Sequence, residues 1–243
     1  MKILSAHQIQ FIPWLGFFSK IKSCDHFVFL DDLKYSKLSF QSRNKVISNS
    51  IEKSLWLSIP VDKSTTKNLF SNVLIDKRQK NWKSKHLKTI YFSYLKSNYF
   101  DEIYTDIENL YKNDEDNLSK FIYKFIQYGL EIFQINTRIF FQSELIKHGL
   151  TQDKKKSELL LEITKFLNCE CFLFGSNAKK YFFEEHKKIF IDQKINFLYQ
   201  NFIHPIYPQY NSNKFLPNLS FLDLLFNCGK NESLKYLQIS KAT

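Results

Sequence analysis

Polar side chains with catalytic potential follow three apolar stretches of the sequence. They are His7-Gln8 after residues 2–6, Asp31-Asp32 after residues 26–30, and Gly175-Ser176-Asn177 after residues 171–174. In a parallel sheet, ligands bind outside the carboxyl ends of the strands. If the three stretches are neighbouring strands, we expect the three polar groups to line one pocket.

Two of these groups suit acid–base catalysis. His7 can act as a general base or donate to a phosphate, or it can simply satisfy backbone groups at a strand end. Asp31 and Asp32 can bind a metal, accept from a sugar hydroxyl or take a proton from an amine. We expect one aspartate of the pair to cap the following loop instead. The catalytic candidates are therefore His7 and Asp31, and the sequence does not decide which of them is the base.

Further residues can bind an anionic sugar substrate. Arg43 is one of three arginines in the chain, and its guanidinium can hold phosphate or carboxylate through two bonds. An ordinary surface ion pair is the alternative role. We expect Lys179 to hold a diphosphate together with Arg43, and Gln8, Gln41 and Asn44 to bind sugar hydroxyls.

Two loops have a weaker sequence signal for ligand binding than the residues above. The Gly175-Ser176 turn leads towards a helix, whose free N–H groups attract anions, but most such turns are only connections. The proline-stiffened segment from His204 to Pro208 also carries Tyr207, and its rings can form a stacking wall for a sugar or a base. It can equally be a structural connection.

Several common enzyme motifs are absent from the sequence. There is no phosphate-binding Gly-x-x-x-x-Gly-Lys-Ser/Thr loop, no Gly-x-Gly-x-x-Gly fingerprint and no Gly-x-Ser-x-Gly elbow, so kinase, dehydrogenase and hydrolase functions lose their usual support. Cys169 and Cys171 are separated by one residue, unlike a zinc knuckle. We expect these two cysteines, with Cys24 and Cys228, to be free buried thiols, and we expect no metal site.

The elements that must position these residues follow from the apolar pattern. A strand over 2–6, a loop containing Pro13, a helix over 14–23 and a strand over 26–30 form a βαβ unit, so the sheet begins parallel. The later elements predicted are a hairpin over 45–59 with its turn at 48–50, helices over 82–94, 100–111 and 117–127, a helix over 157–167, a strand over 171–174, a helix ending near 188, a strand over 195–199 and a helix over 219–226. The prediction is a single α/β domain over residues 1–243, with a mainly parallel sheet, flanking helices and a β-hairpin insertion. Residues 76–148 form a helical insertion or cap.

Composition sets the broad class. The 243 residues are 44% hydrophobic and 24% charged, as in ordinary globular proteins. No apolar run is long enough to span a membrane and the start does not resemble a signal peptide, so we expect a cytoplasmic protein. The net charge is +11 and comes mostly from lysine, which an AT-rich genome favours. It is compatible with an anionic small substrate and also with nucleic acid.

Ordered motifs along the chain resemble the WbqC-like family. They are His7-Gln8, Pro13-Trp14-Leu15-Gly16-Phe17-Phe18 with Lys20-Ile21, Asp25-x-Phe27-Val28-x-Leu30-Asp31-Asp32, Phe40-Gln41-x-Arg43-Asn44, the Gly175-Ser176 turn with Lys179 and Tyr181, His204-Pro205-x-Tyr207-x-Gln209, and the segment from Phe215 to Asn227. The resemblance covers nearly the whole chain. The sequence departs from the family where Ile9 replaces a usual proline and where the Gly175 turn has fewer glycines.

The resemblance implies a bacterial enzyme of surface-polysaccharide, or O-antigen, biosynthesis. The implied activity is a transferase that N-acylates or N-aminoacylates a nucleotide-linked amino sugar, with acyl-CoA, an acyl carrier or an aminoacyl-tRNA as donor. A glycosyltransferase, an ATP-dependent ligase and a basic protein that binds RNA or a carrier remain alternatives. The candidate substrate-binding residues are Gln8, Trp14, Asp32, Gln41, Arg43, Asn44, Gly175, Ser176, Lys179, Tyr181, His204 and Tyr207.

Overall fold

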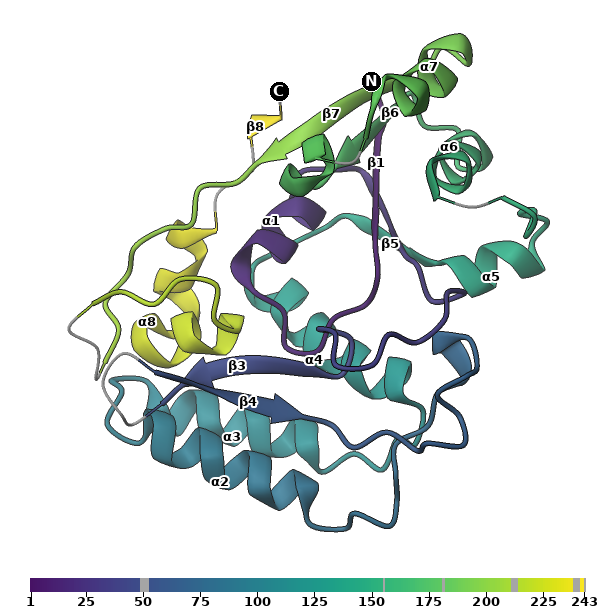
Figure 1. Cartoon of the computed structure of the whole chain (residues 1–243). Helices are drawn as coiled ribbons and strands as arrows, with labels where there is room; N and C mark the ends of the chain where they lie inside the picture. The colour runs from purple at the N-terminus through teal and green to yellow at the C-terminus, as the bar shows by residue number, and fades with distance from the viewer. Residues whose placement is uncertain (49–52, 155, 181, 211–213, 238–240, 243) are drawn as a thin grey trace.

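The computed structural model describes residues 1–48, 53–154, 156–180, 182–210, 214–237 and 241–242. Its centre is a six-stranded sheet in the order β5-β2-β1-β6-β7-β8. The strands are β1 (Ile3–His7), β2 (His26–Phe29), β5 (Arg138–Phe141), β6 (Cys171–Phe174), β7 (Asn196–Asn201) and β8 (Lys241–Ala242). The first five strands in this order are parallel, and β8 pairs antiparallel with β7. The predicted α/β class with a mainly parallel sheet is confirmed (Figure 1).

Helices cover both faces of the sheet, which explains why its central strands are largely buried on both sides. All four residues of β2 and of β6 are buried, as in parallel sheets enclosed by helices. One core lies between the sheet and the helices α1 (Leu15–Lys22), α4 (Leu118–Ile132) and α8 (Phe221–Tyr236). A second core lies on the other face, against α5 (Gln142–Lys147), α6 (Lys156–Phe166) and α7 (Glu184–Asp192).

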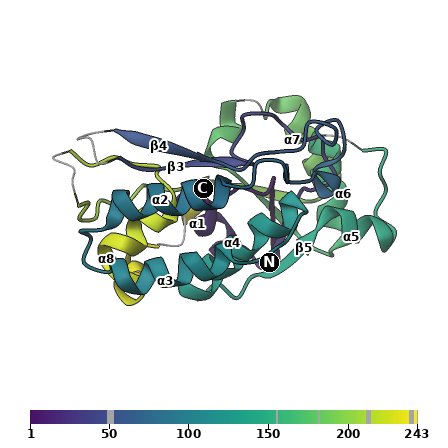
Figure 2. The same ribbon diagram turned by 90° about the horizontal axis from the view of Figure 1, so that it is seen from below.

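The predicted hairpin is present as β3 (Arg43–Ile47) and β4 (Ser54–Ser58), which pair antiparallel. Residues 49 and 50 of its predicted turn lie outside the described residues. The hairpin packs on α2 (Trp82–Tyr94). The hydroxyl of Ser93 in α2 donates to the carbonyl oxygen of Ile47 in β3 at 2.6 Å. Seen from below, the hairpin forms a layer over α2, α3 (Phe100–Tyr111) and α4 (Figure 2).

The apolar spacing of the middle helices accounts for their positions. In α4, buried apolar residues recur at helical intervals from Leu118 to Ile126, so one face of the helix enters the core. Its first turn is capped by the side chain of Asn117, which accepts a hydrogen bond from the backbone N–H of Lys120 at 3.1 Å.

Three features of the fold differ from the predicted elements. The range 76–148 contains α2, α3 and α4, but it ends in β5 and α5, which the sequence did not predict, and β5 is a strand of the main sheet. The last helix continues to Tyr236, with a break at Gly229 where φ is 70°. Two short 3-10 turns, η1 (Phe70–Asn72) and η2 (Ser176–Lys180), complete the fold.

The four cysteines are free and buried, as the sequence predicts. None of the helices in the described ranges combines the length and the apolar character needed to cross a lipid bilayer.

Candidate functional site

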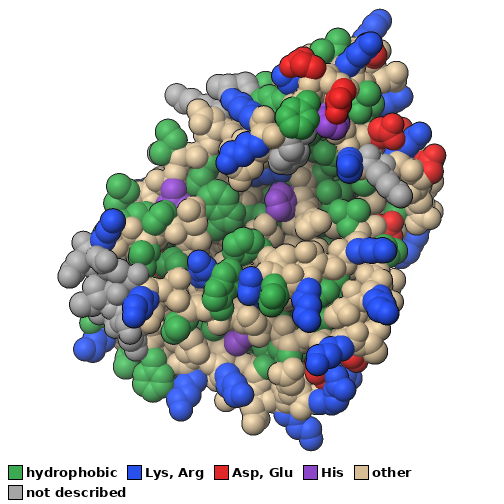
Figure 3. Space-filling view, viewed as in Figure 1, with side chains coloured by type: hydrophobic (Ala, Val, Ile, Leu, Met, Phe, Trp, Pro, Cys, Tyr) green, Lys and Arg blue, Asp and Glu red, His purple; other side chains and the backbone are tan. Residues whose placement is uncertain are grey.

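A cavity of about 330 Å³ opens at the carboxyl ends of β1 and β6. The strand order reverses between these two strands, because the chain passes from β1 outward to β2 and β5 and then returns to β6 on the other side of β1. Open α/β sheets bind their ligands at such a switch point. The cavity is lined by Ala6, His7, Gln8, Trp14, Gly16, Phe17, Lys20, Leu30, Leu160, Phe172, Phe174, Gly175, Ser176, Asn177, Ala178 and Gln200. The molecular surface is hollowed there, with a histidine side chain inside the hollow (Figure 3).

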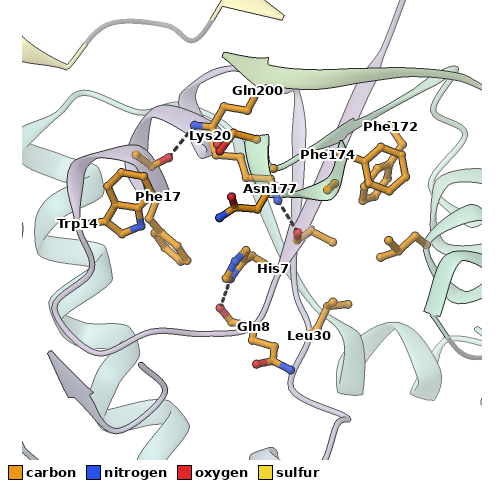
Figure 4. Close-up of a pocket in the computed structure, with 16 residues that line it drawn as sticks. His7, Gln8, Trp14, Phe17, Lys20, Leu30, Phe172, Phe174, Asn177 and Gln200 are labelled. Carbon is orange, nitrogen blue, oxygen red and sulfur yellow. Dashed lines mark hydrogen bonds between the residues drawn. The ribbon is translucent and has the colours of Figure 1, made fainter. Parts of the chain in front are cut away.

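His7 ends β1 and places its ring in this cavity (Figure 4). Its Nδ1 lies 2.8 Å from the backbone carbonyl oxygen of Gln8. A carbonyl oxygen can only accept, so we assign the hydrogen to Nδ1 and the lone pair to Nε2. Burial, followed by the charge of Lys20, lowers the pKa of His7 to about 4. The imidazole is therefore a neutral proton acceptor at pH 7.

Lys20 reaches the same cavity from α1 and is only 5% exposed. Its Nζ donates to the carbonyl oxygen of Ala6 at 2.8 Å. No carboxylate in the described part of the chain forms an ion pair with it, and burial lowers the pKa of Lys20 to about 8. The cavity thus contains a buried ammonium, still protonated at pH 7, beside a neutral base.

An aromatic wall closes one side of the cavity. Trp14 lies over the start of α1, where a Cβ at Gly16 would overlap its indole ring. Phe17 meets the ring of His7 edge-on, with centroids 5.6 Å apart. Behind Trp14 lies His204, whose ring is nearly parallel to the indole at 12° with centroids 6.4 Å apart. His204 therefore supports the wall and does not itself line the cavity.

Amide side chains complete the polar lining. The Asn177 amide points into the cavity between Trp14 and His7 (Figure 4). The Nε2 of Gln200, in β7, donates to the carbonyl oxygen of Gly16 at 2.8 Å and so ties β7 to α1. A Cβ at Gly175 would lie 3.9 Å from Lys20 Nζ, an ordinary contact distance, so Gly175 is next to the ammonium.

Asp31 and Asp32 lie elsewhere. They line a second cavity, of about 870 Å³, between the loop after β2 and the start of α5. Asp31 accepts hydrogen bonds from the backbone N–H of Ser143 at 2.9 Å and from its hydroxyl at 2.6 Å. Burial raises the pKa of Asp31 although the bonds from Ser143 lower it. Asp31 thus caps the first turn of α5, a distant helix, and not the loop directly after it as we expected for one member of the pair.

The residues around β3 have structural partners. The Oε1 of Gln41 accepts from the backbone N–H of Ser36 at 2.7 Å. The Nδ2 of Asn44 donates to the carbonyl oxygens of Phe11 and Ile12, at 3.1 and 2.9 Å, and so fixes the loop that follows His7. These two amides hold the loops beside the cavity and do not line it.

Arg43 is also outside the cavity. Its guanidinium carbon lies 4.2 Å from the centre of the Trp56 ring, on the outer face of the hairpin. Lys179 is similarly placed against an aromatic ring, with its Nζ 5.2 Å from the centre of Tyr199.

Tyr207 is buried, and its hydroxyl donates to Asp223 Oδ2 at 2.9 Å. It therefore belongs to the core and offers no stacking face to a ligand. Tyr181 lies outside the described residues.

The structure therefore gathers five of the predicted residues into one cavity. These are His7, Gln8, Trp14, Gly175 and Ser176. Within the ranges described, no three His, Cys, Asp or Glu side chains are close enough together to hold a metal ion.

Sequence reasoning overlooked Lys20 and Gln200 as site residues, whereas Asn177 lines the cavity as expected for the polar group after residues 171–174. A signal for Lys20 was present: Gly16, Phe17 and Cys24, which lie three or four positions away on the same side of the helix, are non-polar. Lys20 therefore lies on a largely apolar face of α1. Gln200 directly follows the predicted strand over 195–199, so the rule that ligands bind beyond the ends of parallel strands could have marked it.

Comparisons with known proteins agree with the motifs. A model of the WbqC-like protein family matches residues 8–235. The chain is also similar to the uncharacterized protein Rv1507c of Mycobacterium tuberculosis (strain ATCC 25618 / H37Rv), with 27% identity over 243 residues and 98% of each chain covered. No solved structure gives a significant match.

Proposed function

This chain belongs to the WbqC-like protein family, and from that premise we propose that it is a transferase of bacterial surface-glycan biosynthesis. Its substrate is a nucleotide-linked amino sugar, and the reaction is N-acylation or N-aminoacylation of the sugar amine. The reaction takes place in the cavity between β1 and β6.

The observation that carries the proposal is the neutral imidazole of His7 in that cavity. Forming an amide requires an uncharged amine and a group that accepts the proton lost during attack. Nδ1 of His7 is occupied by the Gln8 carbonyl at 2.8 Å, which leaves the Nε2 lone pair to accept that proton. The low pKa of His7 keeps it unprotonated before the substrate binds.

The reaction uses two side chains of the cavity, the ammonium of Lys20 and the imidazole of His7. The amine nitrogen attacks the carbonyl carbon of an acyl thioester or ester, forming the C–N bond and moving an electron pair onto the carbonyl oxygen. Lys20, the buried cation, stabilises this oxyanion. As the oxyanion collapses, the C–S or C–O bond breaks, and the proton taken from the amine by His7 passes to the leaving group.

The size of the cavity limits which part of the substrate enters. Its volume of about 330 Å³ is at the small end of ligand pockets, which span roughly 300–1,000 Å³. A sugar ring with a short acyl group fits this space, whereas the carrier nucleotide must lie outside it.

The test is incubation of the protein with nucleotide amino sugars and with acyl-CoA or aminoacyl-tRNA, followed by mass spectrometry. We expect a product heavier by one acyl group. Transfer should fall by about 100-fold or more in His7→Gln. His148→Gln, the same change at the exposed end of α5, should leave transfer unchanged.

Other products would contradict the proposal. Release of free nucleoside diphosphate would indicate a glycosyltransferase, and formation of AMP or ADP would indicate a ligase. Absence of any product, with binding of RNA that weakens steeply as salt increases, would indicate a basic binding protein.

A further inference from the structure

The outer face of the β3–β4 hairpin carries a cluster of aromatic and basic side chains. The cluster, which we call the hairpin platform, consists of Phe40, Arg43, Lys45 and Trp56. Phe40 is 46% exposed and Trp56 is 42% exposed. In the space-filling view, hydrophobic and basic side chains alternate over β3 and β4, on the same face as the hollow that holds the histidine (Figure 3).

The platform follows from the alternation of the two strands. Lys45 pairs directly with Trp56 in the hairpin, and Arg43, two residues earlier, lies on the same side of the sheet. The intervening residues Asn44 and Val46 are buried beneath. The platform residues are therefore turned away from the core, and their exposed rings contribute little to its packing.

The contacts within the platform preorganise its charges. Arg43 stacks on Trp56 with its guanidinium carbon 4.2 Å from the ring centre, and the Lys45 Nζ lies 4.9 Å from the same centre. Stacking leaves the two terminal NH₂ groups of a guanidinium free to bind phosphate, whereas the Nε of Arg43 is buried and has no hydrogen-bond partner among the described residues. Phe40 adds a second ring, with its centre 5.8 Å from that of Trp56.

No acidic side chain among the described residues neutralises these two cations. In the described part of the chain neither Arg43 nor Lys45 forms an ion pair, whereas Arg78 is held by Asp76 at 2.7 Å. Two uncompensated cations beside two exposed rings match a ligand that has both phosphate groups and an aromatic base.

The platform is fastened to the loop that leaves the cavity. The backbone N–H of Phe11 donates to the carbonyl oxygen of Phe40 at 3.0 Å, and Asn44 binds the same loop. His7 precedes Phe11 by four residues, which limits the separation of their Cα atoms to about 14 Å. A nucleotide on the platform can therefore carry a sugar that reaches His7.

We propose that the hairpin platform binds the nucleoside diphosphate part of the activated substrate. The base stacks on the exposed ring of Trp56 beside the ring of Phe40, which is tilted by 44°, and the phosphates pair with Arg43 and Lys45. This inference rests on the proposed function because it completes the substrate of the same site. Its test measures binding alone and does not require transfer.

The experiment is a calorimetric titration of the full chain with free UDP, TDP, GDP and ADP. We expect at least one of them to bind. Trp56→Ala should weaken that binding about tenfold or more, and Trp56→Phe should retain most of it. Arg43→Lys, which keeps the charge but loses the planar fork, should weaken it about fivefold. Lys88→Gln removes one charge from an exposed position of α2 and should have little effect.

His7→Gln separates this proposal from the proposed function, because it should lower transfer by about 100-fold or more and leave nucleotide binding intact. Binding that depends on Trp56 in a protein without transfer activity would support the platform and contradict the transferase. Equal binding by wild type and a folded Trp56→Ala variant would overturn the platform. So would binding of single-stranded RNA with none of the free nucleotides, or a dimer that Trp56→Ala dissociates.

Discussion

Lys20 illustrates how a single residue can oppose folding while serving the site. Its folded pKa of about 8 lies below the usual value of 10.5. Between these two pH values the unfolded chain binds more protons than the folded one, so this group makes stability rise with pH. At pH 7 the full penalty of burying the ammonium remains, about 3 kcal/mol. Residues with such a penalty are typically retained for function.

Replacing Lys20 by Met should therefore stabilise the protein and inactivate it. We expect the free energy of unfolding at pH 7 to rise by about 1–2 kcal/mol, because the lost hydrogen bond to Ala6 offsets part of the gain. The gain should shrink as the pH increases from 8 to 10. Urea unfolding at pH 7 and pH 10, with a transfer assay, measures both effects.

Lys22→Met is the matched control for this prediction. Lys22 is on the same helix but only partly buried, so its replacement should change stability by less than about 0.5 kcal/mol. A Lys20→Met variant that is less stable than wild type at pH 7 would show that other groups compensate the buried charge.

At the scale of secondary-structure elements, the local spacing of apolar residues was sufficient to predict the middle helices. The structure places α2 and α3 at the predicted residues, 82–94 and 100–111. Each of these helices buries one face, formed by apolar residues three and four positions apart. This spacing is visible directly in the sequence.

Two elements could not be predicted in this way. The strand β5 has only four residues, its partner β2 is more than 100 residues away, and α5 follows it without a turn residue. The predicted last helix ends at residue 226, three residues before Gly229, and glycine commonly ends helices. The chain instead resumes a helix beyond it, and a Cβ at Gly229 would overlap the ring of Tyr99.

The site was predictable to the extent that strand ends define it. His7 and Gly175 meet because both follow strands that pair in the sheet. The role of Asp31 depends on Ser143, 112 residues later in the chain. No local pattern contains that contact, so a buried cap and a catalytic carboxylate are indistinguishable in the sequence.

Asp31 connects two elements, since it joins the end of β2 to the first turn of α5. Asp31→Ala removes both hydrogen bonds to Ser143 and should lower the free energy of unfolding by about 2 kcal/mol. Transfer activity should stay within about twofold of wild type if His7 is the base. Chemical unfolding and the mass-spectrometric assay test this. A folded Asp31→Ala variant without activity would instead assign the base to Asp31.

At the scale of the whole molecule, a buried carboxylate joins segments far apart in the chain. Asp223 of α8 is fully buried and accepts from Tyr94 of α2 at 3.0 Å and from Tyr207 at 2.9 Å. Gln209 donates to it as well, through Nε2 at 2.7 Å. The segment 204–210, α8 and the helix beneath the hairpin platform are thus fixed to one another through this side chain.

The protonation of Asp223 gives this linkage a distinctive pH dependence. Burial raises the pKa of Asp223 to about 6, although its three hydrogen-bond donors lower it. Because the folded chain holds the proton above the usual pKa of 3.8, it binds more protons than the unfolded chain between about pH 4 and pH 6. The contribution of Asp223 to stability therefore falls by about 3 kcal/mol as the pH rises through this interval.

Asp223→Asn removes the titrating group while keeping its shape, so the stability advantage of wild type over this variant should shrink as the pH rises from 4 to 6. Urea unfolding of both proteins at half-unit pH steps measures the difference and cancels the titration of groups they share. Tyr94→Phe keeps the carboxylate but removes one donor, which should raise the pKa of Asp223 further and shift the fall to higher pH. A difference between wild type and Asp223→Asn that grows with pH would mean that the carboxylate is ionised throughout and stabilised by its donors.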